Sequence, residues 1–146
     1  MIKYFYRLEY YKNNDEDTFN LGVFSCVKNA RKKQKQAETQ LGFRDNPNNF
    51  RLIKFGVKFD DNAVVKKSGT VLYCVWLEYE ETIDGIIYDF PTIFGYYATE
   101  REANEVAEYK KKHSRVGKKH PENMSVDEDP VDTYNDWSKG FVPWDE

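Results

Sequence analysis

Two histidines and two cysteines are the first candidates in this chain for metal binding or nucleophilic chemistry. His113 and His120 flank a basic stretch, and positive neighbours disfavour both a bound cation and a histidine proton. Cys26 and Cys74 lie far apart and form no metal-ligand spacing, and neither has a histidine nearby in the sequence. We therefore expect no catalytic residue, no metal, no cofactor and two reduced thiols.

Acidic side chains gather toward the C-terminus, where paired carboxylates could do acid–base chemistry or bind a divalent cation. Their spacing fits no calcium loop, which also needs a glycine at its turn. We interpret them as a surface that faces a partner, with one tryptophan as an anchor. For that tryptophan, packing of the C-terminal segment onto the body is the stronger alternative. The predicted partner-binding residues are Glu122, Asp127, Glu128, Asp129, Asp132, Asp136 and Trp137.

Charge is unevenly placed along the chain, whose net charge is −3. Residues 1–69 hold 14 Lys/Arg and 8 Asp/Glu, a net of +6, whereas residues 70–146 hold 8 and 17, a net of −9. An acidic surface that complements a basic partner speeds association and selects that partner. The sequence therefore favours a non-enzymatic protein-binding module, an immunity or inhibitor-like factor whose partner is a basic toxin or nuclease.

Nucleic-acid binding is the alternative function. Basic runs such as Arg31-Lys32-Lys33-Gln34-Lys35 and Lys110-Lys111-Lys112 fall on predicted helices, and strand aromatics beside them could stack bases. Against this, the isoelectric point is about 5.5, and the aromatics alternate as core residues do. None of the eight glycines belongs to a phosphate-cradling motif, so nucleotide chemistry is unsupported.

The elements that must position these residues form two strand-strand-helix-strand units. In the first half, alternation of apolar and polar residues predicts strands over 2–11, 18–24 and 50–59. Helical spacing predicts a helix over 26–41, which Gly42 ends. Ser25 is expected to cap that helix, and Gly22 to mark a bulge. In the second half we expect strands over 71–79 and 86–98 and a helix over 99–110 that begins with a capping box. A basic loop over 113–123 and a last strand over 124–134 follow. Pro91 indicates an edge strand or a bulge.

The second half also repeats features of the first. Leu8-Glu9-Tyr10 recurs as Leu77-Glu78-Tyr79, and Leu21-Gly22-Val23-Phe24-Ser25 recurs in character as Phe94-Gly95-Tyr96-Tyr97-Ala98. Such a repeat requires each half to be one supersecondary unit. We predict an α+β fold in which two half-ferredoxin-like units form an antiparallel sheet with helices packed on one face. This gives a single compact domain over 1–146, with repeats at 1–60 and 70–141 and a linker at 61–69.

Three motifs resemble a family of small bacterial domains of unknown function. Leu21-Gly22-Val23-Phe24-Ser25 is similar to its Gly-Val-Tyr-Ser strand end, and residues 42–50 to its Gly-Phe-x-Asp-x-Pro-x-x-Phe loop. Trp137-Ser138-Lys139-Gly140-Phe141 matches its closing Trp-x-x-Gly-Phe segment, but at the end of the second copy. The resemblance implies the same fold, a bacterial or phage origin and an accessory or immunity-type role. It implies no activity.

No membrane segment is expected. The longest apolar run, Val71 to Leu77, has seven residues, and a spanning helix needs about twenty. A basic segment followed by an apolar one, which would mark a secretory signal, is not visible at the N-terminus. The sequence therefore favours a cytoplasmic location.

Overall fold

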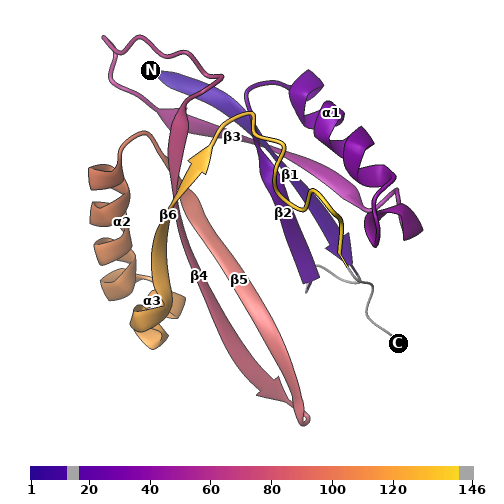
Figure 1. The fold of residues 1–146 in the computed structure, drawn as a ribbon. Coiled ribbons are helices and arrows are strands. Elements are labelled where there is room, and N and C mark those ends of the chain that lie inside the picture. Colours follow the sequence, from indigo (N-terminus) through magenta and orange to yellow (C-terminus); the bar gives the residue numbers. More distant parts are fainter. Residues whose placement is uncertain (13–16, 142–146) are drawn as a thin grey trace. The chain divides into compact units, whose positions relative to one another are not determined.

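The computed structural model describes residues 1–12 and 17–141, which form two compact units (Figure 1). The described residues of the β1–β3 unit lie within Lys3–Gly56, Val64–Thr70 and 130–141. The β4–β6 unit comprises Met1–Ile2, Val57–Ala63 and Val71–Asp129. Each unit has an antiparallel three-stranded sheet and a helix beside it. The predicted α+β class is therefore confirmed.

The β1–β3 unit takes its strands in the order β2-β1-β3. Its elements are β1 (Ile2–Lys12), β2 (Asp17–Phe24), α1 (Val27–Glu38), the 3-10 turn η1 (Phe43–Asp45) and β3 (Phe50–Lys58). One side of α1 is apolar and packs on the sheet, because Ala30 and Ala37 recur at helical spacing. The core around them consists of Leu8, Tyr10, Leu21, Phe24 and Phe43.

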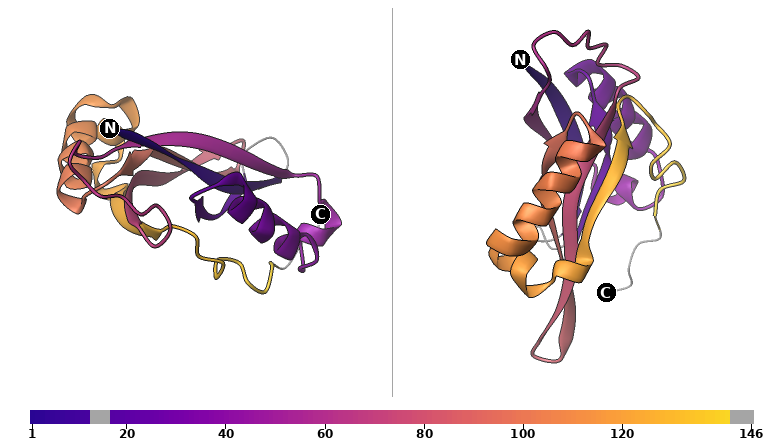
Figure 2. Two further views of the ribbon diagram at one scale, coloured as in Figure 1. Left: turned by 90° about the horizontal axis from the view of Figure 1, so that it is seen from above. Right: turned by 90° about the vertical axis from the view of Figure 1, so that its left-hand side faces the viewer.

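The β4–β6 unit takes its strands in the order β5-β4-β6. Its elements are β4 (Val71–Ile83), β5 (Ile86–Tyr97), α2 (Glu100–His113), α3 (Arg115–Lys119), the 3-10 turn η2 (Pro121–Asn123) and β6 (Met124–Pro130). The apolar run makes β4 the central strand, and Pro91 lies in the edge strand β5, as predicted. Figure 2 shows α2 along this sheet, where Ala103 and Ala107 pack against Val75.

Both units carry a bulge beside a glycine. In β2, Leu21 is the extra residue, because Leu8 pairs with Gly22 and Glu9 with Asn20. In β5 the extra residue is Phe94, next to Gly95. The glycines adopt φ angles of 129° and 153°, which side-chain-bearing residues rarely adopt. Leu8 pairs with Gly22 and Val75 pairs with Gly95, so Leu8 corresponds to Val75 in the two sheets. The matching sequences Leu8-Glu9-Tyr10 and Leu77-Glu78-Tyr79 are therefore two residues out of register in the structure.

The C-terminal segment, residues 131–141, packs within the β1–β3 unit rather than with β4–β6 (Figures 1 and 2). Val131 forms a parallel bridge to Val23 at the outer edge of β2. Farther along, Phe141 contacts Phe19 and Phe43, with ring centroids 4.7 and 4.8 Å apart. The closing Trp-x-x-Gly-Phe segment therefore completes the core of the first half, in which the sequence lacks that motif.

Helix ends differ from the sequence-based expectations. Cys26, not Ser25, is the N-cap of α1, and the helix ends at Glu38, before Gly42. The expected loop over 113–123 contains α3 and η2, because the Ser114 hydroxyl accepts from the Gly117 amide and starts a new helical turn. The Thr99 cap is confirmed, since its hydroxyl accepts from the Glu102 amide at 3.2 Å. Within the described residues, no helix is long and apolar enough to cross a membrane.

Candidate protein-binding pocket

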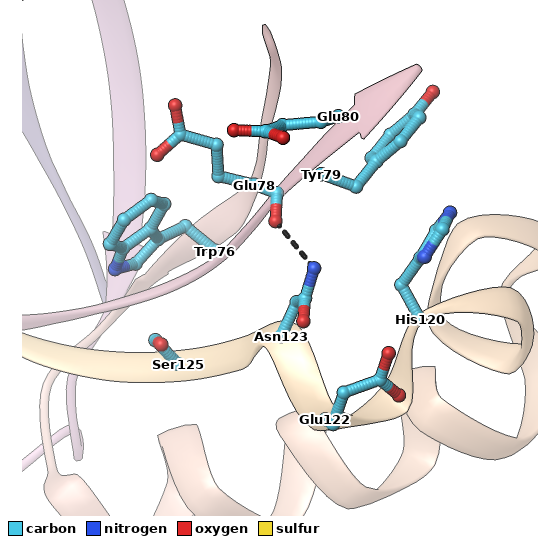
Figure 3. A pocket seen from close by; sticks show the side chains of 8 residues that line it. All are labelled: Trp76, Glu78, Tyr79, Glu80, His120, Glu122, Asn123 and Ser125. Atoms are coloured by element: carbon cyan, nitrogen blue, oxygen red, sulfur yellow. Dashed lines mark hydrogen bonds between the residues drawn. The ribbon is translucent and has the colours of Figure 1, made fainter. Parts of the chain in front are cut away.

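The β4–β6 unit carries an open pocket of about 660 Å³ (Figure 3). It lies along β4 at the point where η2 leads into β6. Asn123 fixes this junction, because its side-chain amide donates to the backbone oxygen of Glu78 at 2.9 Å. Since β6 begins at Met124, β4 continues past it toward Ile83. The pocket therefore lies at a step in the sheet, and its lining residues are Trp76, Glu78, Tyr79, Glu80, His120, Glu122, Asn123 and Ser125.

Strand alternation places three of the four lining side chains of β4 on one face, whereas Tyr79 reaches the pocket from the other face, beside His120. Val75 packs toward α2, so Trp76, Glu78 and Glu80 project from the opposite face of β4. Residues two apart on a strand are separated by about 7 Å, so the two carboxylates are neighbours on that face. On β6, Val126 packs toward α2 and Ser125 projects to the other face. The same alternation that builds the core thus brings the acidic side chains to one surface.

The pocket joins negative charge to aromatic surface. Among the described residues, three carboxylates line it, those of Glu78, Glu80 and Glu122, and no lysine or arginine does. The Trp76 indole forms one wall, and its Nε1 donates a hydrogen bond to the Asp127 carboxylate. Carboxylates beside aromatic faces suit an ammonium or guanidinium group, which gains both ion pairing and cation–π attraction.

His120 and Tyr79 form a stacked pair at one side of the pocket, with ring centroids 4.6 Å apart and an interplanar angle of 14° (Figure 3). The Nε2 atom of His120 is enclosed and has no hydrogen-bond partner among the described residues. Buried polar atoms normally have a partner, so the hydrogen-bonding capacity of this one is unused within the unit. Lys119 pairs with Glu81 at 3.4 Å and lines a neighbouring pocket, which shares Tyr79 and His120 with the acidic one.

The structure divides the predicted partner-binding residues between the two units. Glu122 lines the pocket, and Asp127 bonds to the indole of Trp76. Glu128 is exposed and Asp129 half-buried, both on β6. The other three, Asp132, Asp136 and Trp137, belong to the β1–β3 unit.

Asp132 is engaged inside its own unit. Its carboxylate accepts hydrogen bonds from the Ser25 amide at 2.8 Å and from the Ser25 hydroxyl at 2.5 Å. Burial by itself would raise the pKa of Asp132, but hydrogen bonds from Ser25, Ser68 and Asn29 outweigh burial and lower it. A side chain held in this way stabilises the start of α1.

Trp137 packs on the unit and also meets solvent. Its ring lies 4.6 Å from that of Phe19, and the residue is 39% exposed. One face of the Trp137 ring therefore packs on the body, as the alternative interpretation of this residue expects, and the rest of the residue is exposed. Asp136 is exposed and favours the charged form of the buried Lys33, whose pKa is lowered mainly by burial.

His113 and the two cysteines pack against neighbouring parts of the fold. His113 stacks on Tyr109 with ring centroids 4.3 Å apart, Cys74 is buried, and Cys26 is half-buried at the start of α1. Within residues 1–12 and 17–141, no three acidic, histidine or cysteine side chains are placed to hold a metal ion.

Sequence reasoning missed most of the pocket. The predicted partner-binding residues include Glu122 but neither Glu78 nor Glu80, because the interpretation of β4 depended on its apolar residues. The signal was present in Leu77-Glu78-Tyr79-Glu80, where polar alternation replaces an apolar run in one long strand. That change means that one face of β4 leaves the core and becomes surface.

No family model, no curated protein and no solved structure matches this chain. The likeness of its motifs to a domain family remains an interpretation of the sequence, and functional arguments depend on the geometry.

Proposed function

We propose that this protein is a non-enzymatic binding module, an immunity or inhibitor-like factor that holds a basic side chain of its partner in the acidic pocket of the β4–β6 unit. The observation that carries the proposal is the lining of that pocket, in which the described part of the chain places three carboxylates with Trp76 and Tyr79 and no lysine or arginine. Residues 71–129 together hold 7 Lys/Arg and 13 Asp/Glu, a net of −6. The unit as a whole therefore attracts a basic surface.

An arginine or lysine side chain satisfies each part of this pocket. Its aliphatic stem can lie against the Trp76 ring, and its charged group can pair with Glu78, Glu80 or Glu122. Charge pairs of this kind also set the rate of encounter and exclude acidic partners. A basic toxin or nuclease is a partner of this chemistry.

A growth-rescue assay tests the proposal directly. The protein is produced together with the product of the neighbouring gene, and growth is compared with and without it. We expect rescue by the unaltered protein and loss of rescue by E78Q/E80Q/E122Q, which keeps the side-chain shapes but removes three charges.

The matched control is E100Q/E105Q/E108Q, which removes three exposed carboxylates from α2 of the same unit. Circular dichroism first verifies that both variants fold. Isothermal titration with an arginine-rich peptide then measures the pocket itself. Equal peptide affinity for the pocket variant and the α2 variant contradicts the proposal, and so does turnover of a small substrate by the purified protein.

We further propose that the two units are copies of one half-ferredoxin-like building block. Their strand orders, β2-β1-β3 and β5-β4-β6, correspond. Their glycine bulges, their helix starts and the first buried alanine of each helix share an offset of 73 residues, as in Gly22 and Gly95, Val27 and Glu100, and Ala30 and Ala103. On this view one copy became acidic at its sheet surface, and the other kept a basic helix.

A further inference from the structure

The exposed side of α1 carries a stripe of cations. Lys28, Arg31, Lys32 and Lys35 follow the spacing i, i+3, i+4 and i+7, which places all four on one face of the helix. Together with Asn29 they line a groove of about 460 Å³. The opposite side of α1 is committed to the core through Ala30 and Ala37.

These four cations lack carboxylate partners among the described residues. Arg31 instead donates to the neutral amide oxygen of Gln34, and the Lys32 ammonium lies 5.0 Å from the centre of the Tyr134 ring. The one acidic residue of α1, Glu38, accepts from the Gln34 amide at 3.1 Å. The positive charge of the stripe is therefore available to a ligand.

The arrangement is unfavourable for the helix itself. Like charges at i, i+3 and i, i+4 destabilise a helix. Lys28 also lies in the first turn, where the helix dipole disfavours a cation, and no acidic residue is present there. Rules of local stability are typically broken in this way at sites that serve a function.

The corresponding helix of the other unit makes the contrast clear. In α2 the first turn holds Glu100 and Glu102, and three lysines and His113 gather in the last turn. Arg101, the cation of the first turn, pairs with Glu105 one turn later. Most charges of α2 thus agree with the dipole, and the exception has a carboxylate partner. Since both helices begin at equivalent points, the unpaired stripe is specific to α1 and does not follow from the shape of the unit.

We propose that this stripe is a second binding site, which takes the phosphate backbone of a nucleic acid. From Lys28 to Lys35 the helix rises by about 10 Å, the length of about three phosphates along one strand. Lysine and arginine are the residues that neutralise such a backbone, and they do so without reading its sequence. A membrane surface fits less well, because the face opposite the stripe is buried and leaves no apolar side to insert.

Fluorescence anisotropy with a labelled single-stranded oligonucleotide tests the site, with a duplex of the same length as a second probe. We expect single-strand affinity to fall about twentyfold between about 50 and 200 mM salt, a slope of about −2 on logarithmic axes for three phosphates. The K28Q/R31Q/K32Q/K35Q variant should lose at least tenfold in affinity at about 50 mM salt, and its slope should approach zero.

The matched control is K111Q/K112Q/K118Q/K119Q, which removes the same charge from α2 and α3 and should bind within about twofold of the unaltered protein. If the fourfold α1 variant fails to fold, R31Q/K32Q gives the same test, because both side chains are exposed. The pocket variant E78Q/E80Q/E122Q should bind the oligonucleotide at least as well as the unaltered protein, which separates this site from the proposed protein-binding function.

Four results would overturn the inference: no oligonucleotide binding at low ionic strength, undiminished binding by the fourfold α1 variant, equal loss in the α2 and α3 control, or tighter binding to phosphatidylserine vesicles or polyglutamate than to the oligonucleotide.

Discussion

Gly140 has a backbone conformation and a location that both require glycine. Its φ angle is 73°, and a Cβ atom built there would lie 2.1 Å from the backbone oxygen of Leu41. The close approach exists because the Phe141 amide donates to that same oxygen at 2.8 Å. A side chain at this position would separate the C-terminal segment from the loop after α1.

We expect G140A to lower the free energy of unfolding by about 3 kcal/mol, as the sum of a left-handed conformation and a backbone clash. G69A is the matched control, since Gly69 has a φ of 83° but nothing within 4 Å of its Cβ position. It should cost only about 1 kcal/mol. Urea denaturation measures both, and equal costs would show that the contact with Leu41 is unimportant.

Asp132 makes stability depend on pH. Its pKa is lowered in the folded protein, so the folded state binds this proton less readily than the unfolded state does. The contribution is complete above the ordinary pKa of about 3.9 and is lost as the pH falls through the lower folded-state pKa. We expect D132N to unfold more easily than the unaltered protein at neutral pH.

The measurement is the difference between the urea midpoints of the two proteins as the pH is lowered. That difference should shrink as Asp132 becomes protonated. A difference that stays constant down to about pH 2 would mean that the hydrogen bonds to Ser25 do not depend on the charge.

At the scale of the elements, the C-terminal segment contributes several contacts to the β1–β3 unit. Besides its aromatic contacts, the Gln40 side chain donates to the backbone oxygen of Ser138 at 2.6 Å, and the Lys33 ammonium donates to that of Tyr134 at 3.0 Å. The segment therefore covers α1 and the loop after it. It acts as part of the core rather than as an appendage.

We expect F141A to destabilise the protein by about 3 kcal/mol, because the ring fills a space between Tyr10, Phe19 and Phe43. W137A should cost less, about 1 kcal/mol, because Trp137 is partly exposed. Thermal unfolding followed by circular dichroism compares the two variants. A larger loss for W137A would assign the anchoring role to the tryptophan.

The strands and helices could be predicted because their patterns are local. Alternation in β1 and β4, the Thr99 cap and the bulge at Gly22 each depend on a few neighbouring residues. The destination of the C-terminal segment could not be predicted in this way. It depends on Leu41 and Gly140, which are far apart in the sequence and meet only in the folded unit.

At the scale of the whole molecule, charge is separated by element. The basic stripe lies on α1, and the acidic pocket lies on the β4 and β6 strands. Counting charge along the sequence predicted this asymmetry, but it selected Asp132, which is engaged with Ser25, and missed Glu78 and Glu80. A charge count shows where along the sequence charge is in excess. The alternation of side chains along a strand decides which of those charged side chains share one face of the sheet.

Salt should therefore act mainly on the rate at which a basic partner associates. With a labelled arginine-rich peptide in stopped flow, we expect the association rate constant to fall steeply with ionic strength while the dissociation rate constant changes little. E78Q/E80Q/E122Q should weaken this dependence more than E100Q/E105Q/E108Q. If salt acts equally on the two rate constants, long-range attraction does not guide the encounter.

The use of residues 131–141 to close the β1–β3 unit has a consequence for synthesis on the ribosome. The Gln40 side chain cannot form its hydrogen bond to the backbone oxygen of Ser138 until that residue has been translated, 98 residues later. Nascent chains stalled within β6 should therefore leave the first-made half open to proteases and available to chaperones, although all its strands have already emerged. The β1–β3 unit therefore cannot complete its folding early in synthesis, as N-terminal units usually do, but only after residues 131–141 have emerged.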